Sequence, residues 1–313
     1  ALLMGTIDKV KAGEFTDDDI RAIITNFEVG EKARLESNGA RVGVMADSFI
    51  SFEPWAETVS RLDRLRRVTK DDVVRVARKY LGADRVVAMR RNGKPELPSI
   101  TKPNFTKVEI DTARQSRFAA GILSMPVTPP TPRWISENKD YFLREEAWGR
   151  LYMAPNPSND LFSLSFSFER GQANERELCA AFDLLDLSGG GELTAEQFKR
   201  KLYALGSSMG LGCGERGSSV SLSGLEKNLW ASLELLEKRF KAPNTEPDTL
   251  KKLVEVELGR HQDNKKDPGY VHYALGDVAK RGADSQVLKQ LTDDELKALK
   301  TERLHKLIKE AFS

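Results

Sequence analysis

The clearest pattern of hydrophobic and polar positions lies between residues 161 and 168, where the two kinds of residue alternate. Side chains of an extended backbone point to opposite faces of a sheet with a period of two residues. The two sets are Phe162, Leu164, Phe166 and Phe168 against Leu161, Ser163, Ser165 and Ser167. The pattern predicts a strand whose phenylalanine face packs on helices and whose serine face is less buried.

The residues around this strand predict further helices and a hairpin. The predicted elements are strands over 151–154, 207–212 and 218–223, helices over 175–187, 195–205, 225–239, 250–262 and 270–280, and a last helical region from Thr292. Thr194 is a suitable N-cap, and the glycines after Ser188 are typical of a helix C-cap. The hairpins favour an antiparallel sheet with helices packed on one face, which is an α+β fold.

The first 95 residues are predicted to be helices followed by one strand. Thr16 and Thr69 each precede acidic residues and hydrophobic positions at helical spacing, so each is expected to cap a helix. The predicted elements are a helix after Thr16, helices over 34–51 and 55–65, a helix from Thr69 to Gly82, a strand over 85–90 and a turn at Asn92–Gly93.

Prolines distinguish the segment from Pro95 to about Asp140. They are Pro95, Pro98, Pro103, Pro126, Pro129, Pro130 and Pro132. Prolines at this density prevent regular packing, so we predict a linker over 96–140. Its apolar residues indicate that part of the linker is docked on a surface: Phe118, Ile122, Leu123 and Met125.

Composition narrows the function classes. A length of 313 residues favours two domains, and the net charge of +2 gives no field that would attract nucleic acid or an anionic membrane. No apolar run approaches the roughly 18–20 residues that cross a bilayer. The two cysteines, Cys179 and Cys213, do not form a disulfide framework by their number, and we interpret them as ordinary thiols that leave the compartment undecided.

Two stretches resemble the insulinase/pitrilysin family of zinc peptidases. Residues 68–81 look like the closing helix of one family domain, and residues 149–224 look like the opening of the next. The resemblance implies repeated metallopeptidase-like domains that form a clamshell around an unfolded peptide. It assigns 1–95 to the end of one domain, 96–140 to a linker and 141–313 to a following, inactive and incomplete domain.

The resemblance also locates the helix that would carry the zinc motif His-x-x-Glu-His. One register places the two histidines at Ala181 and Leu185 and the glutamate at Leu184; the other places them at Ala180 and Leu184, with Asp183 for the glutamate. Neither register supplies an imidazole, although a catalytic zinc needs about three protein ligands. We therefore expect no catalytic residue and no metal ligand in this chain.

Two acidic residues and the three histidines of the sequence complete the metal candidates. Glu255 and Glu257 lie where the family's distal zinc-binding glutamate would be, and we interpret both as solvated carboxylates on a helix. A site built from His261, Asp263 and His272 is conceivable, but a helix-end His261 and a half-buried His272 are commoner arrangements. The remaining histidine, His305, lies among charged residues and is predicted to be at the surface.

A glycine-rich stretch gives the only candidates for binding substrate. Gly210, Gly212 and Gly214 are spaced along the predicted hairpin as if to let another backbone come close. In a peptidase relative, a sheet edge here would receive an extended peptide by strand addition. The alternative is a flexible hairpin with no such role. The glycines at 189–191 follow a helix and lack Gly-Lys-Ser/Thr, so they indicate a turn and not a phosphate loop.

These observations favour a non-catalytic portion of a pitrilysin-type zinc endopeptidase. It would form the chamber wall and grip a peptide or unfolded protein, while zinc and hydrolysis belong to an absent N-terminal half of the same polypeptide. The alternative is a non-enzymatic scaffold subunit of the processing-peptidase or respiratory core-protein type. We expect no nucleic acid partner, no membrane span, and a soluble protein of the bacterial periplasm or cytoplasm.

Overall fold

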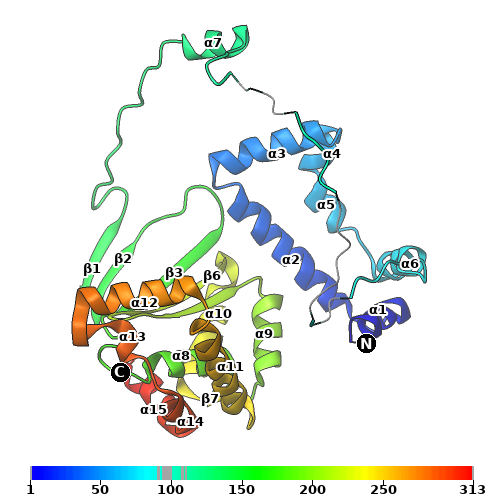
Figure 1. Cartoon of the computed structure of the whole chain (residues 1–313). Helices are drawn as coiled ribbons and strands as arrows, with labels where there is room; N and C mark the ends of the chain where they lie inside the picture. Colours follow the sequence, from blue (N-terminus) through cyan, green and yellow to red (C-terminus); the bar gives the residue numbers. More distant parts are fainter. Residues whose placement is uncertain (1, 90–91, 94–100, 107–108, 110, 312–313) are drawn as a thin grey trace. The chain divides into compact units, whose positions relative to one another are not determined.

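The computed structural model describes residues 2–89, 92–93, 101–106, 109 and 111–311. The chain divides into two units, and Figure 1 labels their helices and strands. The larger unit joins Ala1–Gly82 to Asn156–Ser313, and the smaller unit is Ala83–Pro155. The predicted linker begins at residue 96, which lies outside the described residues, as do Pro95 and Pro98. The predicted domain boundaries stay a prediction.

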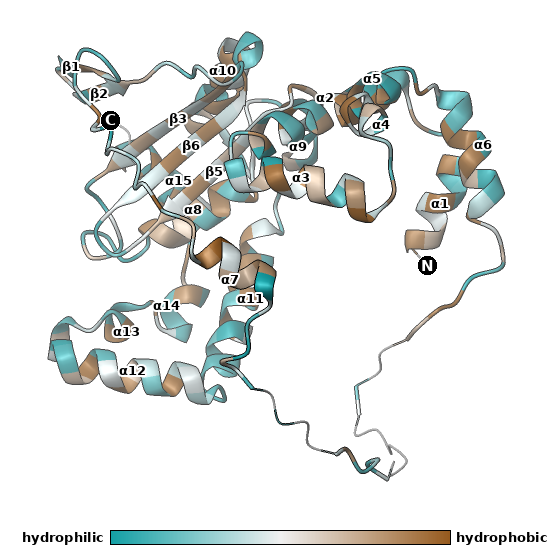
Figure 2. Cartoon of the chain, turned by 90° about the horizontal axis from the view of Figure 1, so that it is seen from above, coloured by the Kyte–Doolittle hydropathy of each residue, from teal (hydrophilic) through white to brown (hydrophobic). Residues whose placement is uncertain are grey.

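A three-stranded antiparallel sheet is the centre of the larger unit. Its strands are β3 (Leu161–Phe168), β5 (Ser208–Cys213) and β6 (Ser218–Leu225), in the order β3-β6-β5. The predicted alternating strand is confirmed. Hydrophobic and polar residues form alternating bands across the strands (Figure 2). Along most of the register, residues of one kind lie opposite each other, as where Leu222 of β6 pairs with Leu164 on one side and Met209 on the other.

Helices cover the hydrophobic face of this sheet. They are α8 (Leu178–Asp186), α9 (Ala195–Ala204), α10 (Leu229–Lys241), with a 3-10 turn before it at Glu226–Asn228, and α15 (Thr301–Ala311). One hydrophobic cluster joins α8, α10 and α15 to β6, and a second joins α9 to β6 and α10. The predicted α+β fold, with antiparallel strands and helices on one face, is confirmed.

The glycine C-cap predicted for α8 is wrong, because the C-cap residue is Leu187 and the glycines begin two residues later. Gly189–Gly190 form a short strand, β4, that pairs with β7 (Pro243–Asn244). A Cβ added to Gly190 would lie 2.6 Å from the Cα of Arg239, so no side chain fits where β4 meets α10. Only Gly191 has a positive φ, of 62°, in this run. The sequence indicated a simple turn here because the pairing strand lies far along the chain.

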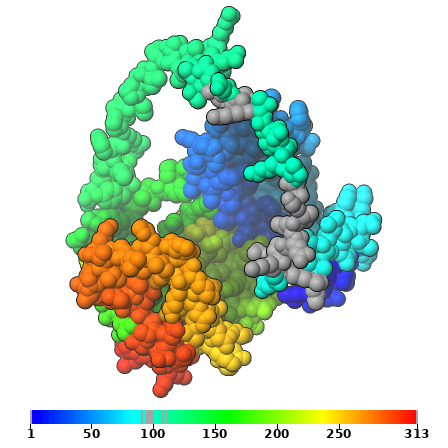
Figure 3. All heavy atoms as spheres, in the orientation of Figure 1, coloured from blue at the N-terminus to red at the C-terminus, as the bar shows by residue number. Residues whose placement is uncertain are grey.

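Four more helices follow β7. They are α11 (Thr249–Asn264), α12 (Pro268–Arg281), α13 (Gln286–Lys289) and α14 (Asp293–Lys297), with a 3-10 turn at Gly282–Asp284. The helices from α12 to α15 are orange to red in Figure 3. Thr292 caps α14 through a capping box with Glu295, as its position in the sequence predicts.

The N-terminal part of the larger unit is helical. Its helices are α1 (Leu2–Ala12), α2 (Asp17–Arg34), α3 (Asn38–Ile50), α4 (Trp55–Val59), α5 (Arg61–Leu65) and α6 (Lys70–Tyr80). Thr16 and Thr69 make the predicted capping boxes. The helix predicted over 55–65 is interrupted at Ser60. Asn26 of α2 donates to the carbonyl of Tyr203 at 2.7 Å, and Lys32 pairs with Asp160 at 2.6 Å.

The smaller unit contains α7 (Arg117–Leu123) and a hairpin of β1 (Phe142–Glu146) with β2 (Gly149–Met153). The strand predicted over 85–90 is wrong for residues 85–89, which the structure does not assign to a strand. Residue 90 lies outside the described part. Phe118, Ile122, Leu123 and Met125 of the predicted linker are exposed within the smaller unit. The docking of the linker on another surface stays a prediction.

Candidate functional site

The core side of α8 contains the positions that the zinc motif would occupy in the first register. Ala181, Leu184 and Leu185 are at most 1 % exposed. They pack with Val220 of β6 and with Leu304 and Ile308 of α15. Hydrocarbon side chains therefore fill these positions and bind the helix to the sheet, and no polar ligand could replace them without burying an unpaired polar group.

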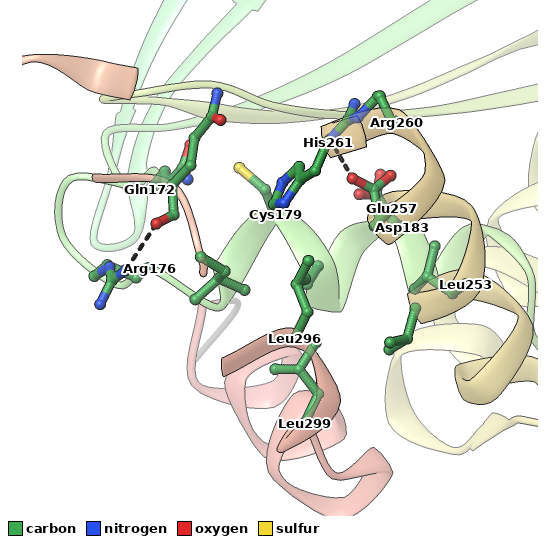
Figure 4. Close-up of a pocket in the computed structure, with 14 residues that line it drawn as sticks. Gln172, Arg176, Cys179, Asp183, Leu253, Glu257, Arg260, His261, Leu296 and Leu299 are labelled. Atoms are coloured by element: carbon green, nitrogen blue, oxygen red, sulfur yellow. Dashed lines mark hydrogen bonds and ion pairs between the residues drawn. The ribbon is translucent and has the colours of Figure 1, made fainter. Parts of the chain in front are cut away.

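The other side of α8 borders a pocket of about 110 Å³. Its wall includes Cys179, Ala180 and Asp183 of α8, and residues of α11 face them, among them Glu257 (Figure 4). Two of the three positions of the second register, Ala180 and Asp183, therefore line the pocket, while the third, Leu184, is completely buried. This pocket is the candidate site of the chain.

Two carboxylates face each other in the pocket. Asp183 has a raised pKa, first because burial penalises its charge and then because the Glu257 carboxylate is near. The side chain of Glu257 is only 17 % exposed and pairs with Arg260 on the next turn of α11. The interpretation of Glu257 as a solvated carboxylate is therefore wrong, because α11 turns it toward α8. Glu255 is exposed, as predicted.

Ion pairs tie the remaining polar residues of the pocket to neighbouring helices. Arg176 binds both carboxylate oxygens of Glu295, at 2.5 and 2.7 Å. That guanidinium and the backbone amide of Thr292 lower the pKa of Glu295 to about 2. His261 contacts Asp293 through Nδ1 at 2.8 Å, and this hydrogen bond lowers the pKa of Asp293. These pairs fix the pocket wall and are already satisfied without a ligand.

The pocket residues do not fit a catalytic zinc. Asp183 and Glu257 are the two carboxylates that face each other, and the charge of Glu257 is balanced by its ion pair with Arg260. Nδ1 of the nearby His261 is engaged by Asp293. Across the described part of the chain, no group of three His, Cys, Asp or Glu side chains could hold a metal ion. Zinc chemistry requires about three donors with an open position, and this donor set falls short of that.

The structure separates the residues of the conceivable His261, Asp263 and His272 site. His261 faces Asp293, Asp263 is exposed and lies near Lys266, and His272 is exposed. The expectation of a half-buried His272 is wrong. No metal group that includes these three residues occurs among the described residues.

The prediction of a surface His305 is wrong as well. Its Nε2 lies 2.8 Å from Oγ1 of Thr245, which lies 2.6 Å from Oγ of the buried Ser188. Ser188 donates its single hydroxyl proton to the carbonyl of Leu184, so Thr245 donates to Ser188 and His305 donates to Thr245. Burial lowers the pKa of His305. The chain of hydrogen bonds is structural, since it connects α15 to the end of α8.

The glycine candidates lie along one edge of the sheet. Gly210 and Gly212 belong to β5, which pairs only with β6 among the described strands. A Cβ on either glycine would lie 2.7 or 2.8 Å from the hydroxyl of Ser221 or Ser219, so packing against the serine face also favours glycine there. Gly214 lies beyond the strand, in the hairpin turn. Whether these glycines bind substrate stays a prediction.

The interpretation of the cysteines as ordinary thiols is wrong. Cys179 and Cys213 form a disulfide, with their Cα atoms 5.2 Å apart. The pairing joins the first turn of α8 to the last residue of β5. Only the tertiary packing of helix on sheet brings them together, because they are 34 residues apart in the sequence. Their positions on a predicted helix and at a predicted strand end were the only available signal.

No protein-family model matches the sequence, and no curated protein matches it. Several solved structures do. The periplasmic protease PqqL from Escherichia coli is 12 % identical over 100 % of this chain and 37 % of its own, with a TM-score of 0.50. The inactive domain of an M16 peptidase from Pseudomonas fluorescens is 17 % identical over 54 % of this chain and 42 % of its own, with a TM-score of 0.47. The ferredoxin protease FusC, in complex with Arabidopsis ferredoxin, is 14 % identical over 97 % and 37 %, with a TM-score of 0.48.

Of these three structures, only PqqL reaches a TM-score of 0.50, so the conclusion about the fold rests on it. The likeness to PqqL includes the whole of this chain, and at 12 % identity it shows a shared fold and nothing further. The chain spans less than half the length of each of the three structures. Among the described residues, none of the helices has the length and apolarity required to cross a bilayer.

Proposed function

We propose that this chain is a non-catalytic portion of a pitrilysin-type zinc metallopeptidase. It forms part of the wall around a peptide substrate and holds that peptide, while zinc and hydrolysis belong to a catalytic half elsewhere in the same polypeptide. Two observations support the proposal: the fold shared with PqqL, and the chemistry of α8.

The observation that carries the proposal is the packing of α8. A helix that supplies a catalytic zinc site must turn its ligands toward an open position for water. Here Leu184 and Leu185 fill the core at 0 and 1 % exposure, and Ala180 brings only a methyl group to the pocket. The helix therefore stabilises the layer and does not provide catalytic groups.

The free edge of β5 is the surface that we propose for the peptide. An edge strand presents unpaired N–H and C=O groups, and an extended peptide can add to it as a further strand. Gly210 and Gly212 lie on the polar face of β5 and have no side chains, so a peptide backbone can come close to the strand there. A peptide held this way is recognised mainly through its backbone, which suits unfolded substrates of varied sequence.

Peptide binding to the purified chain tests the proposal. A fluorescently labelled extended peptide should bind saturably in an anisotropy titration. Its matched control is the same peptide N-methylated at alternate residues, which cannot donate the hydrogen bonds of strand addition. We expect affinity to fall about tenfold or more, since several backbone hydrogen bonds at about 1 kcal/mol each are lost.

The same samples test the lack of catalysis. With added zinc, we expect the labelled peptide to remain intact in mass spectra. Equal binding of the two peptides would contradict strand addition. Zinc-dependent cleavage would contradict the non-catalytic assignment, whatever the binding result.

A further inference from the structure

The disulfide ends at the strand edge to which the peptide is proposed to bind. Cys213 is the last residue of β5, and Cys179 is the second residue of α8. Both residues are partly exposed, and the Cys179 sulfur lies at the pocket (Figure 4). The bond uses both cysteines of the sequence. A soluble thiol can therefore approach it from the pocket without unfolding the core.

The hairpin turn after β5 has several noncovalent ties of its own. The carbonyls of Gly214 and Glu215 accept from the amides of Gln172 and Ala173, at 2.9 and 2.7 Å. The Glu215 carboxylate pairs with Arg281 at 3.0 Å and also accepts from Gln286. These contacts hold the turn to the loop before α8 and to α12 and α13.

The disulfide differs from these ties in its position and in its chemistry. It anchors the strand end itself to α8, and it is covalent, so its presence depends on the redox environment. Among the described strands, β5 is hydrogen-bonded to β6 alone, so no second neighbouring strand orders it there. Edge segments open locally at lower free energy than central strands do.

We propose that the Cys179–Cys213 disulfide is a redox-sensitive clamp that orders the β5 edge. The expected consequence, that reduction weakens peptide binding, rests on the proposed function. A dithiol supplies the reducing equivalents. One of its thiolates attacks a sulfur of the bond to give a mixed disulfide, and its second thiol displaces the protein thiol. Cys179 and Cys213 together gain two electrons and two protons, and the dithiol becomes a disulfide.

The clamp implies an oxidising compartment for the working form of the chain. Disulfides persist outside the reducing cytosol and are rare within it. The ordered, peptide-binding form is the oxidised one, and a dithiol of the surroundings switches it off.

Hydrogen exchange on the whole chain tests the clamp. The oxidised protein, and the same protein reduced with dithiothreitol under native conditions, are compared by mass spectrometry. We expect reduction to raise the ratio of β5 to β6 exchange rates at least about tenfold, because β5 then opens locally. Exchange of β6 reports the accompanying loss of global stability. The double variant Cys179→Ser, Cys213→Ser should exchange at the fast rate and not respond to dithiothreitol.

Each outcome decides the proposal. Unchanged exchange of β5 on reduction, or two alkylated cysteines in the unreduced, denatured protein, would overturn the clamp. If the serine variant does not fold, the reduced wild-type protein gives the answer, with circular dichroism confirming its fold. Faster exchange with unaltered peptide affinity would overturn the regulatory role. A lack of peptide binding by the oxidised protein would instead count against the proposed function. The clamp would then be tested by the hydrogen exchange of β5 alone.

Discussion

The core side of α8 and its pocket side face very different surroundings. On the core side, Leu184 and Leu185 are enclosed by the sheet and α15. On the pocket side, Ala180 and Asp183 border a small open space whose charged residues are mostly paired with each other or with residues of neighbouring helices. The difference shows that the helix packs into the core through one side, while the pocket side carries few structural contacts apart from the disulfide at Cys179. Replacing residues on the two sides should therefore have very different effects.

The largest effect is expected on the core side. Leu184→Ala should lower the free energy of unfolding by about 4 kcal/mol, because the side chain is completely buried and its loss leaves a cavity. Urea denaturation followed by circular dichroism measures this. Leu187→Ala, at the end of the same helix and 39 % exposed, is the matched control and should cost less than about 1 kcal/mol. Equal costs for both variants would show that α8 is not packed as described.

The next effect concerns the covalent link between helix and strand. The double variant Cys179→Ser, Cys213→Ser should lose about 3–4 kcal/mol, as the disulfide closes a loop with a sequence separation of 34 residues. Denaturation of wild-type protein with and without a reductant gives an independent value. A variant as stable as the oxidised wild type would mean that the bond does not form.

The smallest effect is expected on the pocket side. The pKa of Asp183 is raised above 3.8, so the folded state holds its proton more tightly than the unfolded state. The resulting stabilisation is present below pH 3.8 and is lost as pH rises through the folded value. Asp183→Asn should therefore stabilise the protein at pH 7, by less than about 1 kcal/mol because the carboxylate is partly solvated, and have no such effect at pH 3.

Melting temperatures at the two pH values measure this difference. The exposed Asp263, which lies on α11 with its side chain 84 % exposed, provides the control variant Asp263→Asn. A stabilisation by Asp183→Asn that is equal at pH 7 and pH 3 would contradict the electrostatic explanation.

Local patterns predicted the parts of the fold that depend on neighbouring residues. The alternation over 161–168 predicted β3, and Thr16, Thr69 and Thr194 predicted their helix starts, since caps and periodicity are read within a few residues. Residues 85–89 have the composition of a strand, but the structure assigns them none. A strand depends on pairing with another segment, which composition cannot show.

The candidate site was less predictable because its contacts join distant segments. The lack of imidazole on α8 is evident in the sequence. The pairing of Cys179 with Cys213, the approach of Glu257 to Asp183 and the hydrogen bond from His305 to Thr245 each depend on how helices pack. A local pattern records the type of each residue and not the partner that tertiary structure brings to it.

Zinc titration of the purified chain, with peptide hydrolysis measured on the same samples, tests the central claim most directly. The packing of α8 predicts no stoichiometric zinc by X-ray fluorescence and an intact peptide at every zinc concentration. Tightly bound zinc at one ion per chain, together with cleavage that Asp183→Asn or Glu257→Gln abolishes, would contradict the account.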